Sequence, residues 1–150
     1  MTKPPAWFSP YAPRMTWLEF NQNIQVDLIN RYVYFEVAKA ACSTVKRRLM
    51  PIVSRGLPET KVVHPTVFES AFAKPFQLPN PMMRRVLEGD KFLRFTFLRE
   101  PTERFVSGYL DKIVRDTPQK ARFVQRHYPD LDASAEITLE MFLSAVETED

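Results

Sequence analysis

Two short clusters in the sequence combine basic side chains with hydroxyl groups, a combination that suits phosphate and sulfate binding. The first runs from Lys39 to Thr44 (KAACST), and the second runs from Arg99 to Ser107 (REPTERFVS). In a turn, backbone amides can hold an anion while a lysine adds charge and hydroxyls add hydrogen bonds. A guanidinium can hold a phosphate through two parallel hydrogen bonds. Both clusters therefore indicate anion-binding chemistry.

Each cluster also has a simpler structural interpretation. In the first, Ser43 could cap the amino end of a helix while Lys39 is an ordinary solvated base. In the second, Arg99 could form a surface ion pair with Glu103 or Asp111. Residue types alone leave these alternatives open.

The elements around the clusters are expected to be strands that lead into helices. YVYFEV, directly after Arg31, has the β-branched and aromatic composition of a buried strand, and KFLRFTFLRE over 91–100 gives another. A basic, helix-favouring stretch follows the first strand, and the second is followed by a helix that begins at Pro101. Alternating strands and helices predict an α/β fold with a mainly parallel central sheet flanked by helices. In such sheets ligands bind at the carboxyl ends of the strands, where both clusters lie.

In the second helix, Phe105, Tyr109 and Ile113 form an apolar stripe at helical spacing. Gly108 interrupts this helix at a cost of about 1 kcal/mol relative to alanine, which predicts that another group approaches closely there.

We interpret the whole chain, 1–150, as one domain. Outside the two clusters, weaker patterns predict an irregular arm over 1–25, a kink or stop at Pro51, a short strand at 61–64 and a long loop with aromatic anchors at 65–81. They also predict helices at 81–90, 119–127 and 138–146.

Composition narrows the possible functions. The first 126 residues hold all 21 Lys and Arg beside 11 acidic residues, a local charge of +10, so the body favours anionic partners. Charge alone does not choose among nucleic acid, acidic glycans and nucleotides. No apolar run approaches the roughly 20 residues of a membrane helix, and the start of the chain lacks a secretory signal. The single cysteine, Cys42, suits a reducing compartment, and we expect a cytoplasmic protein.

Together the two clusters resemble a known pair of motifs. Two segments are similar to the nucleotide-binding motifs of the Golgi-type carbohydrate sulfotransferases and their bacterial relatives. They are KAACSTVKRRL after YVYFEV and, some sixty residues later, FTFLREPTERFVSGYLDK. In the first motif Lys39, Ser43, Thr44 and Lys46 match, while Ala38 stands where the family often has proline. In the second motif Arg99 and Ser107 match, and three further residues fill the surrounding pattern: Glu103, Arg104 and Tyr109.

The resemblance implies a P-loop-like three-layer fold and a donor, 3′-phosphoadenosine 5′-phosphosulfate (PAPS). It implies that the 5′-phosphosulfate lies on the first motif, formed by Lys39, Ala40, Ala41, Cys42, Ser43 and Thr44. It assigns the 3′-phosphate to Arg99 and Ser107. The acceptor is expected to be a hydroxyl of a glycan or of another small molecule, and we expect no metal, nucleic acid or membrane span.

The implied reaction moves a sulfuryl group in line from PAPS to the acceptor. The resemblance assigns to Lys39 the positive charge needed at the bridging oxygen. His64, at the end of the expected strand 61–64, is the predicted base that removes the acceptor proton, with Glu36 and Glu69 in reserve. Alternatively, His64 is a strand-end histidine held by backbone hydrogen bonds.

Two alternative functions follow from the same residues. A non-catalytic module that binds nucleotide or sulfated glycan would use the basic body without needing His64. A nucleotide-dependent phosphotransferase is disfavoured, because no lysine follows a glycine in the first motif and no aspartate motif for Mg²⁺ is evident. Family domains usually continue beyond the position of Asp150, so the C-terminal part of the domain is expected to be missing.

Overall fold

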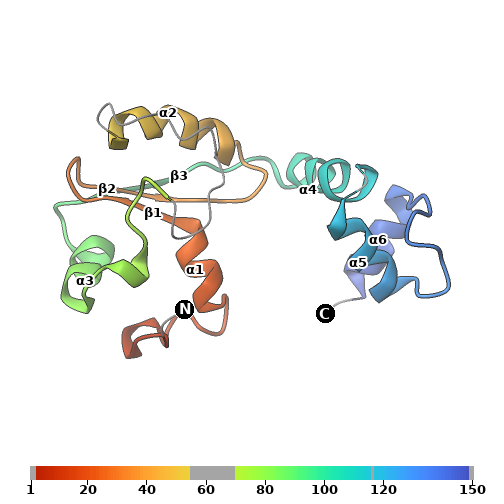
Figure 1. Cartoon of the computed structure of the whole chain (residues 1–150), viewed down its shortest axis with the longest axis horizontal. Helices are drawn as coiled ribbons and strands as arrows, with labels where there is room; N and C mark the ends of the chain where they lie inside the picture. The colour runs from red at the N-terminus through yellow and green to blue at the C-terminus, as the bar shows by residue number, and fades with distance from the viewer. Residues whose placement is uncertain (1–2, 55–69, 116, 149–150) are drawn as a thin grey trace. The chain divides into compact units, whose positions relative to one another are not determined.

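The computed structural model describes residues 3–54, 70–115 and 117–148 (Figure 1). The chain forms two compact units, Met1–Leu98 and Arg99–Asp150, each with its own hydrophobic core. The prediction of a single sulfotransferase-like domain over 1–150 stays a prediction.

The N-terminal segment is more regular than predicted. A 3-10 turn at Ala6–Phe8 is followed by helix α1 (Trp17–Asn23), which runs directly into strand β1 (Ile24–Asp27). A capping box starts α1: the Glu19 amide donates to the Thr16 hydroxyl at 3.2 Å, and the Thr16 amide donates to the Glu19 carboxylate at 2.7 Å. The predicted irregular arm over 1–25 is therefore wrong from Thr16 onward.

A three-stranded sheet forms the centre of the first unit. Strand β2 (Tyr32–Phe35) lies between β1 and β3 (Leu93–Thr96); it pairs antiparallel with β1 and parallel with β3. The described residues thus give a mixed sheet in place of the expected mainly parallel one. The reason is the short β1–β2 connection, which permits only an antiparallel hairpin. Asp27 holds this turn by accepting hydrogen bonds from the Ile29 and Asn30 amides, both at 2.9 Å.

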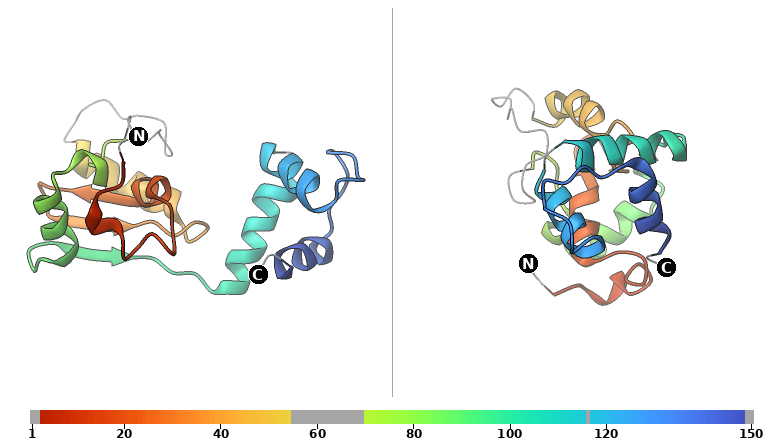
Figure 2. Two further views of the ribbon diagram at one scale, coloured as in Figure 1. Left: turned by 90° about the horizontal axis from the view of Figure 1, so that it is seen from below. Right: turned by 90° about the vertical axis from the view of Figure 1, so that its right-hand side faces the viewer.

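Helices cover both faces of the sheet. Helix α2 (Cys42–Ser54) lies on one face, and α1 and α3 (Asn80–Glu88) lie on the other, so this unit has the three layers that were predicted (Figures 1 and 2). Helix α2 continues through Pro51, where a kink or stop was expected. Gly89 ends α3, as the sequence indicates.

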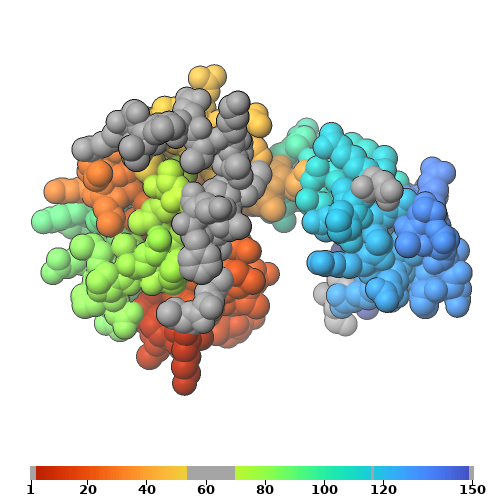
Figure 3. All heavy atoms as spheres, in the orientation of Figure 1, coloured from red at the N-terminus to blue at the C-terminus, as the bar shows by residue number. Residues whose placement is uncertain are grey.

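The core of the first unit lies between the sheet and the α1–α3 layer. It contains Phe8, Trp17, Phe20, Ile24, Val26, Val33, Met83 and Val86. The Trp7 indole donates to the Asn80 side chain at 2.9 Å, which ties the N-terminal residues (red in Figure 3) to the start of α3 (green). Phe72, from the predicted loop with aromatic anchors, is buried, and the adjacent Ala73 forms an isolated β-bridge with Val26. The predicted strand at 61–64 lies outside the described residues.

The second unit is helical. It consists of α4 (Pro101–Tyr109), which continues as a π-helical turn over Leu110–Val114, then α5 (Pro118–His127) and α6 (Leu139–Glu147). The predicted apolar stripe packs inward: Ile113 is buried, and the rings of Phe105 and Tyr109 pack at a tilt against Phe142 of α6. In the part of the chain that the structure describes, no helix is long and apolar enough to cross a membrane.

Candidate functional site

The turn between β2 and α2 holds the first cluster in an unusual backbone conformation. Lys39 has φ of 64° and Ala41 has φ of 61°, both in the left-handed region. For residues other than glycine this conformation costs on the order of 1–3 kcal/mol each, and it persists only where the surrounding structure enforces it. Left-handed residues in a turn are the conformations from which anion-binding nests of backbone N–H groups are built.

Local contacts fix this turn against the first unit. Ala40, between the two left-handed residues, is 3% exposed, and its amide donates to the Val37 carbonyl at 3.2 Å. The Val45 amide donates to the Ala41 carbonyl at 3.0 Å, which joins the turn to α2. The turn is thus held from both sides.

The start of α2 adds further donors beside the turn. Cys42 is the first helical residue and is half-buried, Ser43 is half-buried, and Thr44 is exposed. Amides in the first turn of a helix lack carbonyl partners within the helix, and the helix dipole favours an anion there. Because Ser43 is the second residue of α2, it does not occupy the N-cap position that the simpler interpretation requires. The structure thus brings all six residues of the first cluster together at the carboxyl end of the central strand.

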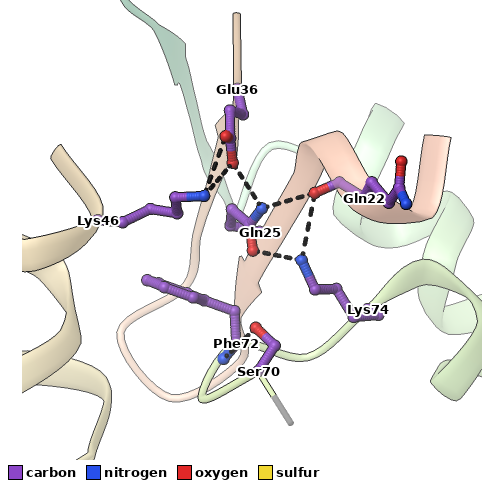
Figure 4. A network of polar contacts seen from close by, with 7 residues as sticks. All are labelled: Gln22, Gln25, Glu36, Lys46, Ser70, Phe72 and Lys74. Carbon is purple, nitrogen blue, oxygen red and sulfur yellow. Dashed lines mark hydrogen bonds and ion pairs between the residues drawn. The ribbon is translucent and has the colours of Figure 1, made fainter. Parts of the chain in front are cut away.

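A buried polar network lies beside this turn (Figure 4). The Lys46 ammonium contacts both Glu36 carboxylate oxygens, at 2.9 and 3.0 Å. Gln25 donates to the Glu36 carboxylate at 3.0 Å and accepts from the Lys74 ammonium at 2.5 Å. The Gln22 carbonyl accepts from Gln25 at 2.8 Å and from Lys74 at 3.4 Å.

This network changes the interpretation of two residues. Glu36 was a reserve candidate for the general base, but its carboxylate is held in a buried ion pair, which disfavours proton abstraction. Lys46 matches the family motif, and in the structure its side chain is 7% exposed and pairs with Glu36. Sequence patterns did not indicate Gln25 or Lys74, because their partners lie far along the chain.

Tyr34 is a further polar group near the turn that sequence analysis missed. Its side chain is fully buried on β2, and its hydroxyl has no hydrogen-bond partner among the described residues. Burial, followed by the charges of Glu36 and Cys42, raises the pKa of Tyr34 to about 12. The hydroxyl therefore stays protonated and is a donor close to the start of α2.

The second cluster lies in the helical unit. Arg99 precedes α4, and its Nε donates to the Glu103 carboxylate at 3.1 Å, with side chains 41% and 63% exposed. This is the ion pair that the simpler interpretation proposed. An exposed pair of this kind contributes only about 0–1 kcal/mol, so a ligand phosphate can compete for the guanidinium.

Ser107 is half-buried within α4. The neighbouring Gly108 does not support the predicted close approach: a Cβ added there would meet no described atom within 4 Å.

Two candidates for the general base, His64 and Glu69, lie outside the residues that the structure describes. The assignment of the base therefore stays a prediction. The described residues contain no cluster of His, Cys, Asp or Glu side chains that could hold a metal ion.

In α/β folds, anionic groups bind where the carboxyl end of a strand leads into the amino end of a helix. The turn between β2 and α2 lies at such a position. The sulfotransferase family model matches residues 22–150, which includes both clusters. The chain belongs to this family, that of the carbohydrate sulfotransferases, as the motifs predicted. No curated protein and no solved structure matches the chain.

Proposed function

We propose that this chain transfers a sulfuryl group from PAPS to a hydroxyl group of a glycan or another small acceptor. Membership of the sulfotransferase family supports transferase activity in general. The proposal that PAPS is the donor is supported mainly by the two left-handed residues, Lys39 and Ala41, in the turn that leads into α2. A strained backbone of this kind is typical of sites that bind ligands.

The residues of the turn suit the 5′ end of the donor. When bound, PAPS supplies an activated sulfuryl group whose departure leaves negative charge on the 5′-phosphate. Amides at the start of α2 and the hydroxyls of Ser43 and Thr44 would hold the anionic group. The Lys39 ammonium would stabilise the charge that develops on the bridging oxygen.

Two further roles complete the proposal. Arg99 would exchange its exposed carboxylate partner for the 3′-phosphate, and Ser107 would add a hydrogen bond. His64 would accept the proton of the acceptor hydroxyl. These two roles rest on the family motif and on chemistry.

The Lys39→Ala variant tests the mechanism. If Lys39 acts mainly in the transition state, the substitution should lower the rate of sulfuryl transfer by about 10²- to 10³-fold while nucleotide affinity changes much less. The measurement is transfer of labelled sulfate from PAPS to a panel of hydroxyl acceptors, together with calorimetric titration of each variant. Lys91→Ala is a matched control, because Lys91 is exposed and precedes the opposite, amino end of β3.

The same assay separates the enzyme from a binding module. Nucleotide binding without transfer to any acceptor would contradict the enzymatic proposal. Unchanged turnover in a folded Lys39→Ala variant would remove Lys39 from the mechanism.

A further inference from the structure

The polar network beside the turn contains buried charges. Three of its side chains are buried, those of Gln25, Lys46 and Lys74, and the Glu36 side chain is 10% exposed (Figure 4). The two lysines come from α2 and from the segment before α3, while Glu36 follows β2 and Gln25 lies in β1. The network therefore joins four separate places in the chain.

Stability alone does not account for this arrangement. Removing charged groups from water costs several kcal/mol per ion, and apolar replacements of buried ion pairs are often neutral or stabilising. In some proteins, buried polar or ionic groups fix one geometry among several. The geometry that this pair can fix is the adjacent turn.

Glu36 and Lys46 lie on either side of the turn between β2 and α2. Glu36 directly follows the last residue of β2, and Lys46 is the fifth residue of α2. Their ion pair closes the chain over the segment between them, which contains the left-handed Lys39 and Ala41. Gln25, paired with Tyr34 in the sheet, supports the carboxylate from the neighbouring strand with a 3.0 Å hydrogen bond.

We propose that Glu36 is a positioning residue for the phosphosulfate turn: through its buried ion pair with Lys46 it holds the turn between β2 and α2 in its anion-binding conformation. This inference rests on the proposed function, because it assumes that the turn binds the 5′-phosphate end of the nucleotide. In this proposal Lys46 also supports the turn, because its ion pair with Glu36 spans the turn.

The test compares two nucleotides that differ only at the 5′ position. 3′-Phosphoadenosine 5′-phosphate carries the 5′-phosphate, and adenosine 3′-phosphate lacks it. The main variant is the double substitution Glu36→Gln with Lys46→Met, because it removes both charges and leaves no carboxylate or ammonium of the pair unpartnered. Lys46→Arg keeps the pair and serves as the conservative variant.

A matched control exists at the other end of the same hairpin. Asp27 is 3% exposed and holds the β1–β2 turn through backbone amides, away from the β2–α2 turn. Asp27→Asn should lower stability while leaving the ratio of the two nucleotide affinities unchanged.

The expected result is selective. In the double variant, affinity for 3′-phosphoadenosine 5′-phosphate should fall by about 10- to 100-fold, because a displaced turn loses its alignment with the phosphate. Affinity for adenosine 3′-phosphate should stay within about twofold. Lys46→Arg should retain most of the preference for the 5′-phosphate.

Two outcomes would overturn the inference, and they are distinguishable. A folded double variant, verified by circular dichroism, that keeps the wild-type affinity ratio would refute the positioning role and leave the proposed function intact. A wild-type chain with no preference for the 5′-phosphate would overturn the proposed function, and the positioning role with it.

Discussion

Ala41 illustrates how much of the site depends on the conformation of single residues. A left-handed alanine is strained by about 1–2 kcal/mol, whereas glycine adopts the same backbone at no steric cost. We predict that Ala41→Gly raises the free energy of unfolding by about 0.5–1 kcal/mol, after the entropic cost of glycine is subtracted. Chemical denaturation measures this change.

The neighbouring Ala38 provides the control for this prediction. Ala38 is exposed and is not among the residues with positive φ, so Ala38→Gly should lower stability by about 0.5–1 kcal/mol. Equal losses of stability in both glycine variants would contradict the strain at Ala41.

The buried Lys74 should make the free energy of unfolding depend on pH. Burial lowers the pKa of Lys74 to about 8, while a lysine in the unfolded chain titrates near about 10.4. Between these values the unfolded chain binds a proton that the folded chain has lost, so stability rises with pH. We expect the free energy of unfolding to gain about 1.5 kcal/mol from this group between pH 8 and 9.5.

The control for the pH prediction is Lys74→Met. It should abolish the rise, and a rise that persists in this variant would assign it to other groups. The measurement stops at pH 9.5, because burial also raises the pKa of Tyr32 and Tyr34 and their titration in the unfolded chain has the opposite effect.

At the residue level, the sequence indicated which residues could form the candidate site, but it did not indicate their backbone conformation. The types and order of residues 39–44 indicated an anion-binding turn, and the structure brings them together at a strand end. The left-handed conformations were not predictable, because alanine and lysine give no signal for positive φ. Lys74 was also missed, because its contact with Gln25 joins residues 49 positions apart.

Helix α4 gives the clearest test at the level of elements. Gly108 lies inside this helix, and a methyl group added there would meet no described atom within 4 Å. We predict that Gly108→Ala raises stability by about 1 kcal/mol, the difference in helix propensity. Thermal or chemical denaturation tests this directly.

Gly89 is the matched glycine for that experiment. A Cβ at Gly89 would lie 2.6 Å from the Arg85 carbonyl oxygen in the backbone of α3, so Gly89→Ala should be destabilising. If Gly108→Ala destabilised the chain as well, a close contact at Gly108 would be indicated, as the sequence first suggested.

The elements that were predicted and those that were missed differ in the strength of their local signals. Strands β2 and β3 and helix α4 have strong patterns and were predicted. Helix α1 was missed because prolines and aromatic residues around it obscure its period, although Thr16 and Glu19 form a capping box. Strand β1 was missed because all four of its residues are buried, including Gln25 and Asp27, which do not look like core residues in the sequence.

At the scale of the whole molecule, the two motifs lie in two compact units, and the family match over residues 22–150 includes both. Each unit has its own core and presents its own anion-binding candidates: the Lys39–Thr44 turn in the first, and Arg99 with Ser107 in the second. The basic charge of the first 126 residues agrees with an anionic substrate. Under the proposed function, the first set would bind the 5′ end of the donor and the second set its 3′-phosphate.

The most direct test of this account is calorimetric titration of the wild-type chain with 3′-phosphoadenosine 5′-phosphate, AMP and ATP, repeated with Arg99→Ala. The 3′-phosphate should strengthen binding relative to AMP by about 2–3 kcal/mol, the contribution of charge-assisted hydrogen bonds. Arg99→Ala should remove most of this gain and leave AMP affinity nearly unchanged. Equal affinities for all three nucleotides, or equal losses for 3′-phosphoadenosine 5′-phosphate and AMP in the variant, would contradict the assignment of a PAPS-dependent sulfotransferase.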